Sequence, residues 1–349
     1  MTSGDHQREG GRAEEAAQSF LWRDGGRTVV FGPGGIAQAA QLLREHGFAP
    51  FELLSTRRAL PGAAELVAAA SAVHQVAPGG VPEAAAAILA SARSPRLVAL
   101  GGGRVIDAAK AVAAVSGAEV AAIPTTMSGA EMTGIHRLPA GAESRVRGMV
   151  RPALVIADDL AMTSQPERAL RFSSMNALAH GADSLYTPFA NPVSRMTALR
   201  GAELIASSLD QPAAERDRTA LALGSILCGY AIDSAMYALH HVICQTLVRI
   251  CGSPHAETNA AILPRAMAFM APRAPAQLAA LGRAIGTDPG EIESRILELG
   301  GDPPRLGEVG ADRSQLVQAI EEILARPELA FTPRSPTRSE LERLIDAAW

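Results

Sequence analysis

The chain has 349 residues, of which 48% are hydrophobic and 19% charged, so it is long enough for two domains with an ample core. A net charge of -4 without a basic cluster argues against nucleic acid as the main partner, and no apolar run reaches the roughly 18 residues that a membrane span requires. We therefore expect a small-molecule ligand, with no nucleic acid and no membrane as partner.

The beginning of the chain and its cysteines indicate where the protein works. Residues 1–18 are rich in Gly, Glu, Arg and Ser and lack the apolar core of a signal peptide, which predicts a disordered tail and a cytoplasmic protein. Cys228, Cys244 and Cys251 lack the Cys-x-x-Cys spacing, so they predict buried thiols rather than disulfides or a cysteine-based metal site.

Strands and helices alternate in the first half of the chain. Strands are predicted over 28–31, 51–55, 73–76, 96–100, 119–123 and 154–156, with helices over 38–45, 62–72, 81–92 and 105–115 and a polar hairpin-like segment over 137–151. This alternation predicts an α/β domain with a parallel sheet and helices on both faces. Beyond residue 160 only helical periods remain, so we expect a dinucleotide-binding domain over 19–160 and an all-α domain over 161–349.

Two loops of the first half have the composition of a nucleotide site. Glycines that follow a strand and precede a helix let the backbone approach a pyrophosphate, and a hydroxyl-rich loop after the next strand adds donors at the same sheet edge. The residues concerned are Gly101, Gly102, Gly103, Thr125, Thr126 and Ser128, with Gly34 and Gly35 after the first strand as further candidates.

Charged residues near these loops have two readings. Arg104 could reach a phosphate or be a solvated surface arginine, and Asp107 with Lys110 could serve the site or form only a surface ion pair. Lys110 is the only lysine among 32 basic residues, which favours a requirement for a compact ammonium there, although chance survival would also explain it. The second strand ends at Ser55, Arg57 and Arg58, which favours NADPH over NADH unless these arginines are merely exposed.

Histidines concentrate in the second half. Of the eight in the chain, His240, His241 and His255 fall within sixteen residues, and Asn176 and His180 are four apart on one face of a predicted helix. Any one of them alone would be read as a hydrogen-bonded core residue. Their clustering instead predicts a buried polar site built from three helices.

Four segments resemble the iron-containing (group III) alcohol dehydrogenase superfamily, with maleylacetate reductases as the most similar branch. The segments are 101–110, 124–133, 176–186 and 239–259, and the similarity runs in order over about residues 19–275. The resemblance implies a Rossmann-like domain, a helical domain with dehydroquinate synthase-like architecture, and hydride transfer from NADH or NADPH in the cleft between them. A homodimer is the default for such folds.

The resemblance also implies a metal site, which this sequence alters. Metal-dependent members hold Fe(II) or Zn(II) with one carboxylate and three histidines, and the matching positions are Asn176, His180, His241 and His255. Asparagine removes the negative charge that would balance a divalent cation, so metal binding is doubtful. Maleylacetate reductases are similar in having asparagine at this position.

Two further departures concern the chemistry. Gln245 stands where the family usually has a histidine near the nicotinamide, and Ala130 replaces a common serine. Glutamine cannot exchange a proton near neutral pH, so His240, His180 or His136 would have to supply one.

The leading interpretation is an NAD(P)H-dependent reductase of a small oxo-carboxylate or related carbonyl. The alkoxide would be stabilised by His180, His241 and His255, with Arg137 and Arg249 as candidate carboxylate clamps. The alternatives are a non-redox lyase or cyclase of a secondary pathway, with the histidines as acids and bases, and a binding or structural subunit without catalysis.

Overall fold

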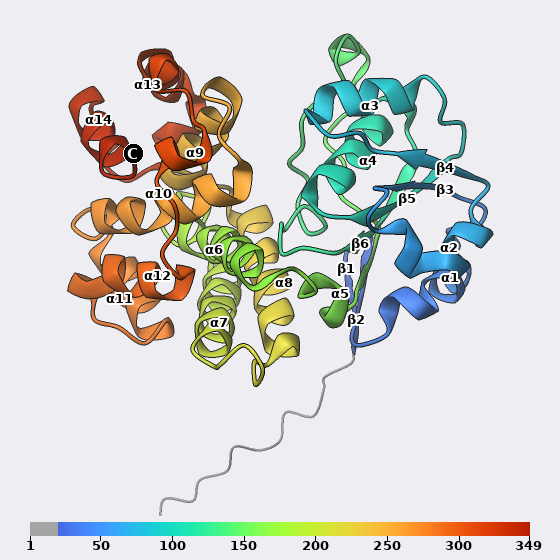
Figure 1. Cartoon of the computed structure of the whole chain (residues 1–349), viewed down its shortest axis with the longest axis horizontal. Coiled ribbons are helices and arrows are strands. Elements are labelled where there is room, and N and C mark those ends of the chain that lie inside the picture. The colour runs from blue at the N-terminus through green and yellow to red at the C-terminus, as the bar shows by residue number, and fades with distance from the viewer. Residues whose placement is uncertain (1–19) are drawn as a thin grey trace, which may run out of the picture.

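The computed structural model describes residues 20–349, so the expected tail over 1–18 lies outside the described residues. The chain forms two lobes, an α/β domain that contains the sheet and a helical domain that follows it (Figure 1). The strands all lie within residues 20–157, and the described residues after them are helical or irregular.

The sheet has the order β1-β2-β7-β6-β5-β3-β4 and is parallel from β2 to β4. Its β5 segment, Leu-Val-Ala-Leu-Gly over 97–101, is buried throughout, as expected for a strand covered on both faces. The strands are β1 (Phe20–Asp24), β2 (Arg27–Phe31), β3 (Glu52–Ser55), β4 (Ala72–Gln75), β5 (Arg96–Gly101), β6 (Glu119–Pro124) and β7 (Leu154–Ala157). The predicted parallel sheet is confirmed.

Two segments differ from the sequence-based expectation. The first predicted strand is the second arm of an antiparallel hairpin, because Gly25 and Gly26 form a tight turn after β1. The hairpin predicted over 137–151 is wrong: this segment has only the short 3-10 helix η2 (Glu143–Arg145) and pairs with no strand of the described sheet.

Helices cover both faces of the sheet (Figure 1). On one face, α1 (Gly35–Glu45) and α2 (Ala64–Ala69), the latter preceded by η1 (Leu60–Ala63), pack with Leu53, Val98 and Ile156. On the other, α3 (Val81–Leu89) and α4 (Gly103–Ser116) pack with Leu54 and Ala99. Alternate residues of one strand thus enter opposite cores, which follows from the two-residue side-chain period of a strand.

The helical domain begins with the short helix α5 (Asp159–Met162). The longer helices are α6 (Glu167–Ser184), α7 (Pro192–Leu209), α8 (Arg218–Ala235), α9 (Leu239–Ile250), α10 (His255–Met270), α11 (Pro275–Ala284), α12 (Ile292–Gly300), α13 (Leu316–Ala325) and α14 (Arg338–Asp346). Its core continues into the α/β domain, because Val29, Phe31 and Val155 of the sheet belong to the same buried cluster.

No single helix of the described residues is long and apolar enough to cross a membrane. Helices α8 and α9 reach that measure only together, and the chain bends by 98° between them.

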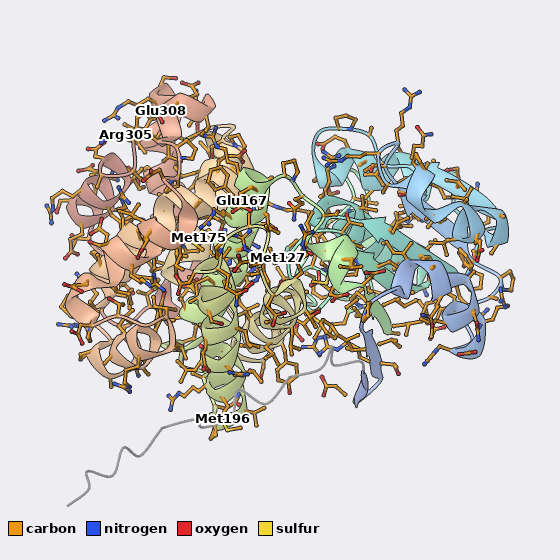
Figure 2. The ribbon with its side chains drawn as sticks, turned by 60° about the horizontal axis from the view of Figure 1, so that its bottom comes forward. Met127, Glu167, Met175, Met196, Arg305 and Glu308 are labelled. Atoms are coloured by element: carbon orange, nitrogen blue, oxygen red, sulfur yellow. The ribbon has the colours of Figure 1, made fainter. Side chains whose placement is uncertain are left out.

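The loop after β6 joins the two domains. Figure 2 shows Met127 of this loop at the junction, where its amide donates to the Ser173 hydroxyl of α6 at 3.0 Å. On the other side, Asp233 of α8 accepts the Gly134 amide at 2.9 Å and pairs with Arg151 at 2.7 Å. These contacts hold the carboxyl edge of the sheet against the helical domain.

Candidate active site

The two loops predicted to bind a nucleotide lie side by side. Gly101 pairs with Pro124 at the end of β5 and β6, so the loops start from adjacent strands. A Cβ on Gly102 would stand 3.1 Å from the Thr126 side chain, and one on Gly103 would stand 2.9 Å from the Ser128 Cβ. Glycine at 102 and 103 therefore lets the first turn of α4, with its free N–H groups, approach the hydroxyl loop closely.

Arg104 follows on the first turn of α4. Its side chain is exposed and, among the described residues, has no ion-pair partner. A free guanidinium beside helix amides can bind an anionic ligand.

The other predicted cofactor residues have different surroundings. Gly34 and Gly35 begin α1 at the end of β2, and β7 and β6 separate this turn from β5. The Asp158 carboxylate accepts the Ile36 amide there at 3.0 Å, so an anion of the chain itself already caps α1. The buried Ser55 hydroxyl donates to the Leu100 carbonyl at 2.8 Å and is thus committed to the sheet.

The predicted 2'-phosphate residues remain free for a ligand. Arg57 and Arg58 follow β3 and are exposed, and no described residue forms an ion pair with either.

Lys110 is fully buried and binds protein groups. Its ammonium donates to Asp107 at 2.9 Å, to the Ala130 carbonyl at 3.0 Å and to the Ile135 carbonyl at 2.7 Å. These bonds hold the 124–135 loop against α4. The planar guanidinium of an arginine would not reach the same three acceptors in the same space.

Glu131 is a buried acid of the same loop that the sequence analysis did not single out. Burial raises its pKa to about 7, against the opposing charge of Lys110, and Oε1 has no hydrogen-bond partner among the described groups. A carboxyl with this pKa holds a proton near neutral pH.

Helix α6 brings Asn176 and His180 against the hydroxyl loop. Asn176 Nδ2 donates to the Ser128 carbonyl at 3.2 Å, which leaves its buried Oδ1 without a described partner. A Cβ on Gly129 would stand 2.6 Å from the His180 ring, so glycine is needed for this contact. His180 Nδ1 is also unpartnered, and burial, together with the charge of His241, holds the pKa of His180 well below its usual value.

His241 lies next to His180, with ring centroids 4.9 Å apart. Its Nδ1 is 2.9 Å from the Asp183 carboxylate, which can only accept, so Nδ1 carries the proton and Nε2 is left buried without a described partner. Asp183 also accepts the backbone amides of Ala238 and His241, at 3.0 and 3.1 Å. Burial alone would raise the pKa of Asp183, but the hydrogen bond from His241 and the nearby histidine charges hold it below its usual range.

The remaining histidines are placed differently. His240 is fully buried behind His241, its Nε2 donates to Asn259 at 2.9 Å, and burial lowers its pKa to about 3. His136 uses both ring nitrogens, on the Arg137 carbonyl at 2.8 Å and the Val150 amide at 3.1 Å. His255 starts α10 and is partly open to solvent. Desolvation by the protein around its ring, followed by the charge of His241, lowers the pKa of His255. His136 thus has no free ring nitrogen for proton donation, and the remaining nitrogen of His240, Nδ1, is enclosed 3.9 Å from the Cys244 sulfur.

Gln245 lies one turn after His241 on α9 and is held by Arg326. The Arg326 guanidinium donates to Gln245 Oε1 at 3.0 Å, to the Tyr237 hydroxyl at 2.8 Å and to Glu328 at 3.2 Å. The Tyr237 ring is 6.0 Å from that of His241. Tyr237 and Arg326 were missed in the sequence, where no local signal connects Arg326 with Gln245, 81 positions earlier, or with Tyr237, 89 positions earlier.

Two more arginines stand near Arg326. Partial burial, followed by the like charges of Arg249 and Arg326, lowers the pKa of Arg137, whose side chain has no ion-pair partner among the described residues. Arg249 pairs with Glu322 at 2.7 Å. The sequence-predicted clamp residues are therefore close enough to influence one another's charge.

The side chains at the four positions that match the family's metal ligands do not fit a tightly bound metal ion. Within residues 20–349, no three His, Cys, Asp or Glu side chains converge closely enough to hold one. Asn176 adds an amide oxygen without charge, so nothing among the four matching positions balances a divalent cation.

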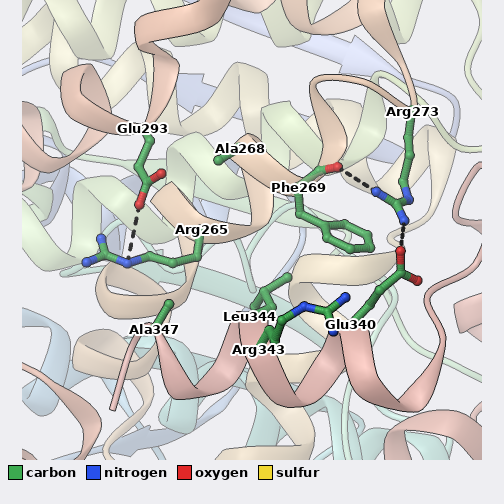
Figure 3. A pocket seen from close by; sticks show the side chains of 9 residues that line it. All are labelled: Arg265, Ala268, Phe269, Arg273, Glu293, Glu340, Arg343, Leu344 and Ala347. Atoms are coloured by element: carbon green, nitrogen blue, oxygen red, sulfur yellow. Dashed lines mark hydrogen bonds and ion pairs between the residues drawn. The ribbon is translucent and has the colours of Figure 1, made fainter.

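A hollow on the helical domain does not gather the predicted site residues (Figure 3). It measures about 340 Å³ and is lined by Arg265, Phe269, Arg273, Glu293, Glu340 and neighbours. Two of its arginines form ion pairs, Arg273 with Glu340 and Arg265 with Glu293, and Arg265 lies ten residues, or about 15 Å of helix, beyond His255.

Comparison with known proteins yields two family models that together match most of the chain. "Iron-containing alcohol dehydrogenase" matches residues 26–159, and "Fe-containing alcohol dehydrogenase family, C-terminal" matches residues 171–349. Maleylacetate reductase 1 of Rhodococcus opacus is 34% identical over 78% of this chain and 78% of its own. Maleylacetate reductase of Rhizobium sp. (strain MTP-10005) is 30% identical over 95% of this chain and 98% of its own.

Solved structures show the same fold. The crystal structure of the Rhizobium maleylacetate reductase superposes with a TM-score of 0.81 at 28% identity, covering 95% of this chain and 98% of that one. The sulfoacetaldehyde reductase of Bifidobacterium kashiwanohense, solved in complex with NAD+, gives a TM-score of 0.78 at 19% identity, covering 94% and 99%.

Proposed function

Because the chain belongs to the iron-containing alcohol dehydrogenase family and is an NAD(P)H-dependent oxidoreductase, we propose that it reduces a small oxo-carboxylate, as a maleylacetate reductase-like enzyme. Similarity to maleylacetate reductases over most of the chain supports this substrate class. The relatives described above are reductases by name, and no observation favours the non-redox lyase or cyclase.

One observation carries the proposal. Asn176, His180 and His241 each keep a buried polar atom without a partner among the described groups, next to the hydroxyl loop at the carboxyl edge of the sheet. Buried polar atoms are nearly always hydrogen-bonded in folded proteins, so an unpartnered group of three indicates a place where a ligand completes the bonds.

We propose that the nicotinamide cofactor binds at the two adjacent loops. The first turn of α4, with Gly102, Gly103 and Arg104, would bind the pyrophosphate, and Thr125, Thr126 and Ser128 would contact the nucleotide from the next strand end. Arg57 and Arg58, which follow β3, would accept a 2'-phosphate, and on that ground we propose NADPH as the cofactor.

The histidines act on the oxygen that gains charge. The nicotinamide would supply hydride to the carbonyl carbon, or to the far end of a double bond conjugated with it, and either route would put negative charge on the carbonyl oxygen. His241 bonds this oxygen through Nε2, the ring atom that Asp183 leaves uncommitted, and delivers a proton there when it is charged. His180 and His255 would line the site beside His241.

We also infer a boundary near residue 160, after the last strand, a cytoplasmic location and a homodimer. The exposed apolar side chains Phe189, Val193 and Met196, at one end of α7, support an association surface.

The test follows oxidation of NADH and NADPH with maleylacetate, with simple 2-oxo acids and with uncharged aldehydes. We expect turnover of the oxo-carboxylates, and we expect the His241→Ala variant to lose at least about a hundredfold in kcat, the size of one acid–base contribution. His46→Ala, in the α/β domain and bound to the Leu42 carbonyl, is the control. Unchanged turnover in His241→Ala would refute the assignment.

A further inference from the structure

We propose that the hollow between α10, α12 and α14 is a second binding site, one that takes a small aromatic carboxylate. The hollow lies on the helical domain, and its lining includes none of the residues assigned above to the cofactor or to the histidine cluster (Figure 3). The inference goes beyond the proposed function and does not depend on it.

The size and the floor of the hollow suit a small organic molecule. Its volume of about 340 Å³ falls within the range of about 300–1,000 Å³ that is typical of small-molecule pockets. The side chains of Ala268, Phe269, Leu344 and Ala347 give it an apolar lining, and Leu344 is buried. A ligand with an apolar body would therefore bury carbon against carbon there.

The Phe269 ring forms a fixed aromatic surface in this lining. The Arg273 guanidinium carbon lies 3.6 Å from the centroid of the ring, and the same guanidinium donates to the Phe269 carbonyl at 3.2 Å and pairs with Glu340. Arg273 thus covers one part of the ring and holds it in place, while the rest of the ring lines the hollow. A second aromatic ring can pack on a surface held in this way with little loss of side-chain freedom.

The charges that line the hollow leave one cation for a ligand. Three arginines and two glutamates contribute to the lining, so it carries one net positive charge. Arg273 pairs with Glu340 and Arg265 with Glu293, whereas the Arg343 guanidinium forms no ion pair or hydrogen bond with the described residues (Figure 3). One carboxylate on Arg343 would balance the charge, and a second would exceed it.

The opposite end of the hollow keeps donors to spare. Figure 3 shows Arg265 and Glu293 at one end, with Arg273 and Glu340 at the other. The distance from Arg265 Nε to the Glu293 carboxylate is 3.6 Å, which is too long for a hydrogen bond, and the buried Nε and Nη1 atoms have no hydrogen-bond partner among the described groups. Since buried donors are nearly always bonded, this end favours a ligand that brings an acceptor or negative potential.

The test measures binding of benzoate to the full-length chain by calorimetry, with benzamide as a probe of the same shape without charge. Arg343→Gln removes the unpaired cation, and Ala347→Phe places a ring in the hollow at an exposed position. The control Arg338→Gln makes the same substitution on α14 at an exposed arginine that pairs with Glu321 and does not line the hollow. Thermal unfolding with and without benzoate provides a second readout.

We expect wild type to bind benzoate at least about tenfold more tightly than benzamide, and Arg343→Gln to lose that preference, as one charge-assisted contact implies. Ala347→Phe should weaken both probes, because it occupies the space that the ring would take. Benzoate should raise the unfolding midpoint of wild type and Arg338→Gln in proportion to its saturation, and should leave that of Arg343→Gln almost unchanged.

Three results would overturn the site: no binding of benzoate, equal affinities of wild type for benzoate and benzamide, or equal losses in Arg343→Gln and Arg338→Gln. Benzoate could also bind at the histidine cluster, so His241→Ala is titrated alongside. Binding that is lost in His241→Ala and kept in Arg343→Gln would place the anion in the candidate active site and refute a second one.

Discussion

Replacing Asp183 by asparagine tests how much one buried carboxylate with several hydrogen-bond donors contributes to stability. The fully buried carboxylate accepts three backbone amides, from Ala238, His240 and His241, together with His241 Nδ1 and the Tyr186 hydroxyl. Asparagine keeps one acceptor oxygen and turns an NH2 group toward donors, so at least one N–H loses its partner and the remaining bonds lose their charge. An unpaired buried N–H costs about 1–3 kcal/mol, and each bond to an ion is worth about 1.5–3 kcal/mol, compared with about 1 when neutral.

The free energy of unfolding should therefore fall by about 3–5 kcal/mol in Asp183→Asn, the range observed when one partner of a buried charge pair is removed. Urea titration followed by circular dichroism measures this loss. Asp210→Asn removes an exposed carboxylate paired with Arg295 and should change stability by less than about 1 kcal/mol. If Asp183→Asn were as mild as Asp210→Asn, the carboxylate would not be organising α9, and the protonation of His241 deduced from it would be wrong.

Two further variants test the 124–135 loop. Glu131 binds its proton more tightly in the folded chain, with its pKa raised from 4.5 to about 7, so its own contribution to stability should fall by about 3 kcal/mol as pH rises through that interval. Urea titrations at about pH 5 and pH 8 should therefore show Glu131→Gln gaining stability relative to wild type as pH rises, and an unchanged difference between the two proteins would contradict the raised pKa. Gly103→Ala places a Cβ 2.9 Å from the Ser128 Cβ and should weaken NADPH binding at least about tenfold, as measured by fluorescence titration. The control Gly62→Ala, with open space around it, should leave the affinity unchanged. Equal affinities of the two variants for NADPH would show that the two loops do not bind the cofactor.

The α/β domain was predictable because its signals are local. Strands buried on both faces read as continuous apolar runs, and the glycines of the loop after β5 mark where the chain turns into a helix. The arm before Gly25 was missed because the strand predicted there covered only residues 28–31 and the two-residue turn at Gly25 and Gly26 was not recognised. The segment 137–151 was misread because polar residues around Gly141 suggested a turn, whereas pairing would have needed a partner that its flanks do not supply.

The candidate site was only partly predictable. The spacing of Asn176 and His180 reveals a common helix face, and both reach the same loop in the structure. The bond between Asp183 and His241 spans 58 residues and the one between Gln245 and Arg326 spans 81, so the partner of each depends on how helices pack rather than on any local pattern. Asp183 had one available signal, its position three residues after His180 in a buried apolar helix.

The burial of Lys110 has a practical consequence. Since it is the only lysine in the sequence and is fully enclosed, reagents that acylate lysine find no accessible lysine side chain in the folded chain. Acylation at this one residue would then occur only when the 124–135 loop detaches from α4, and its rate would report how often that happens. The chain therefore contains a natural single-site probe of local opening, one that a bound nicotinamide cofactor should slow.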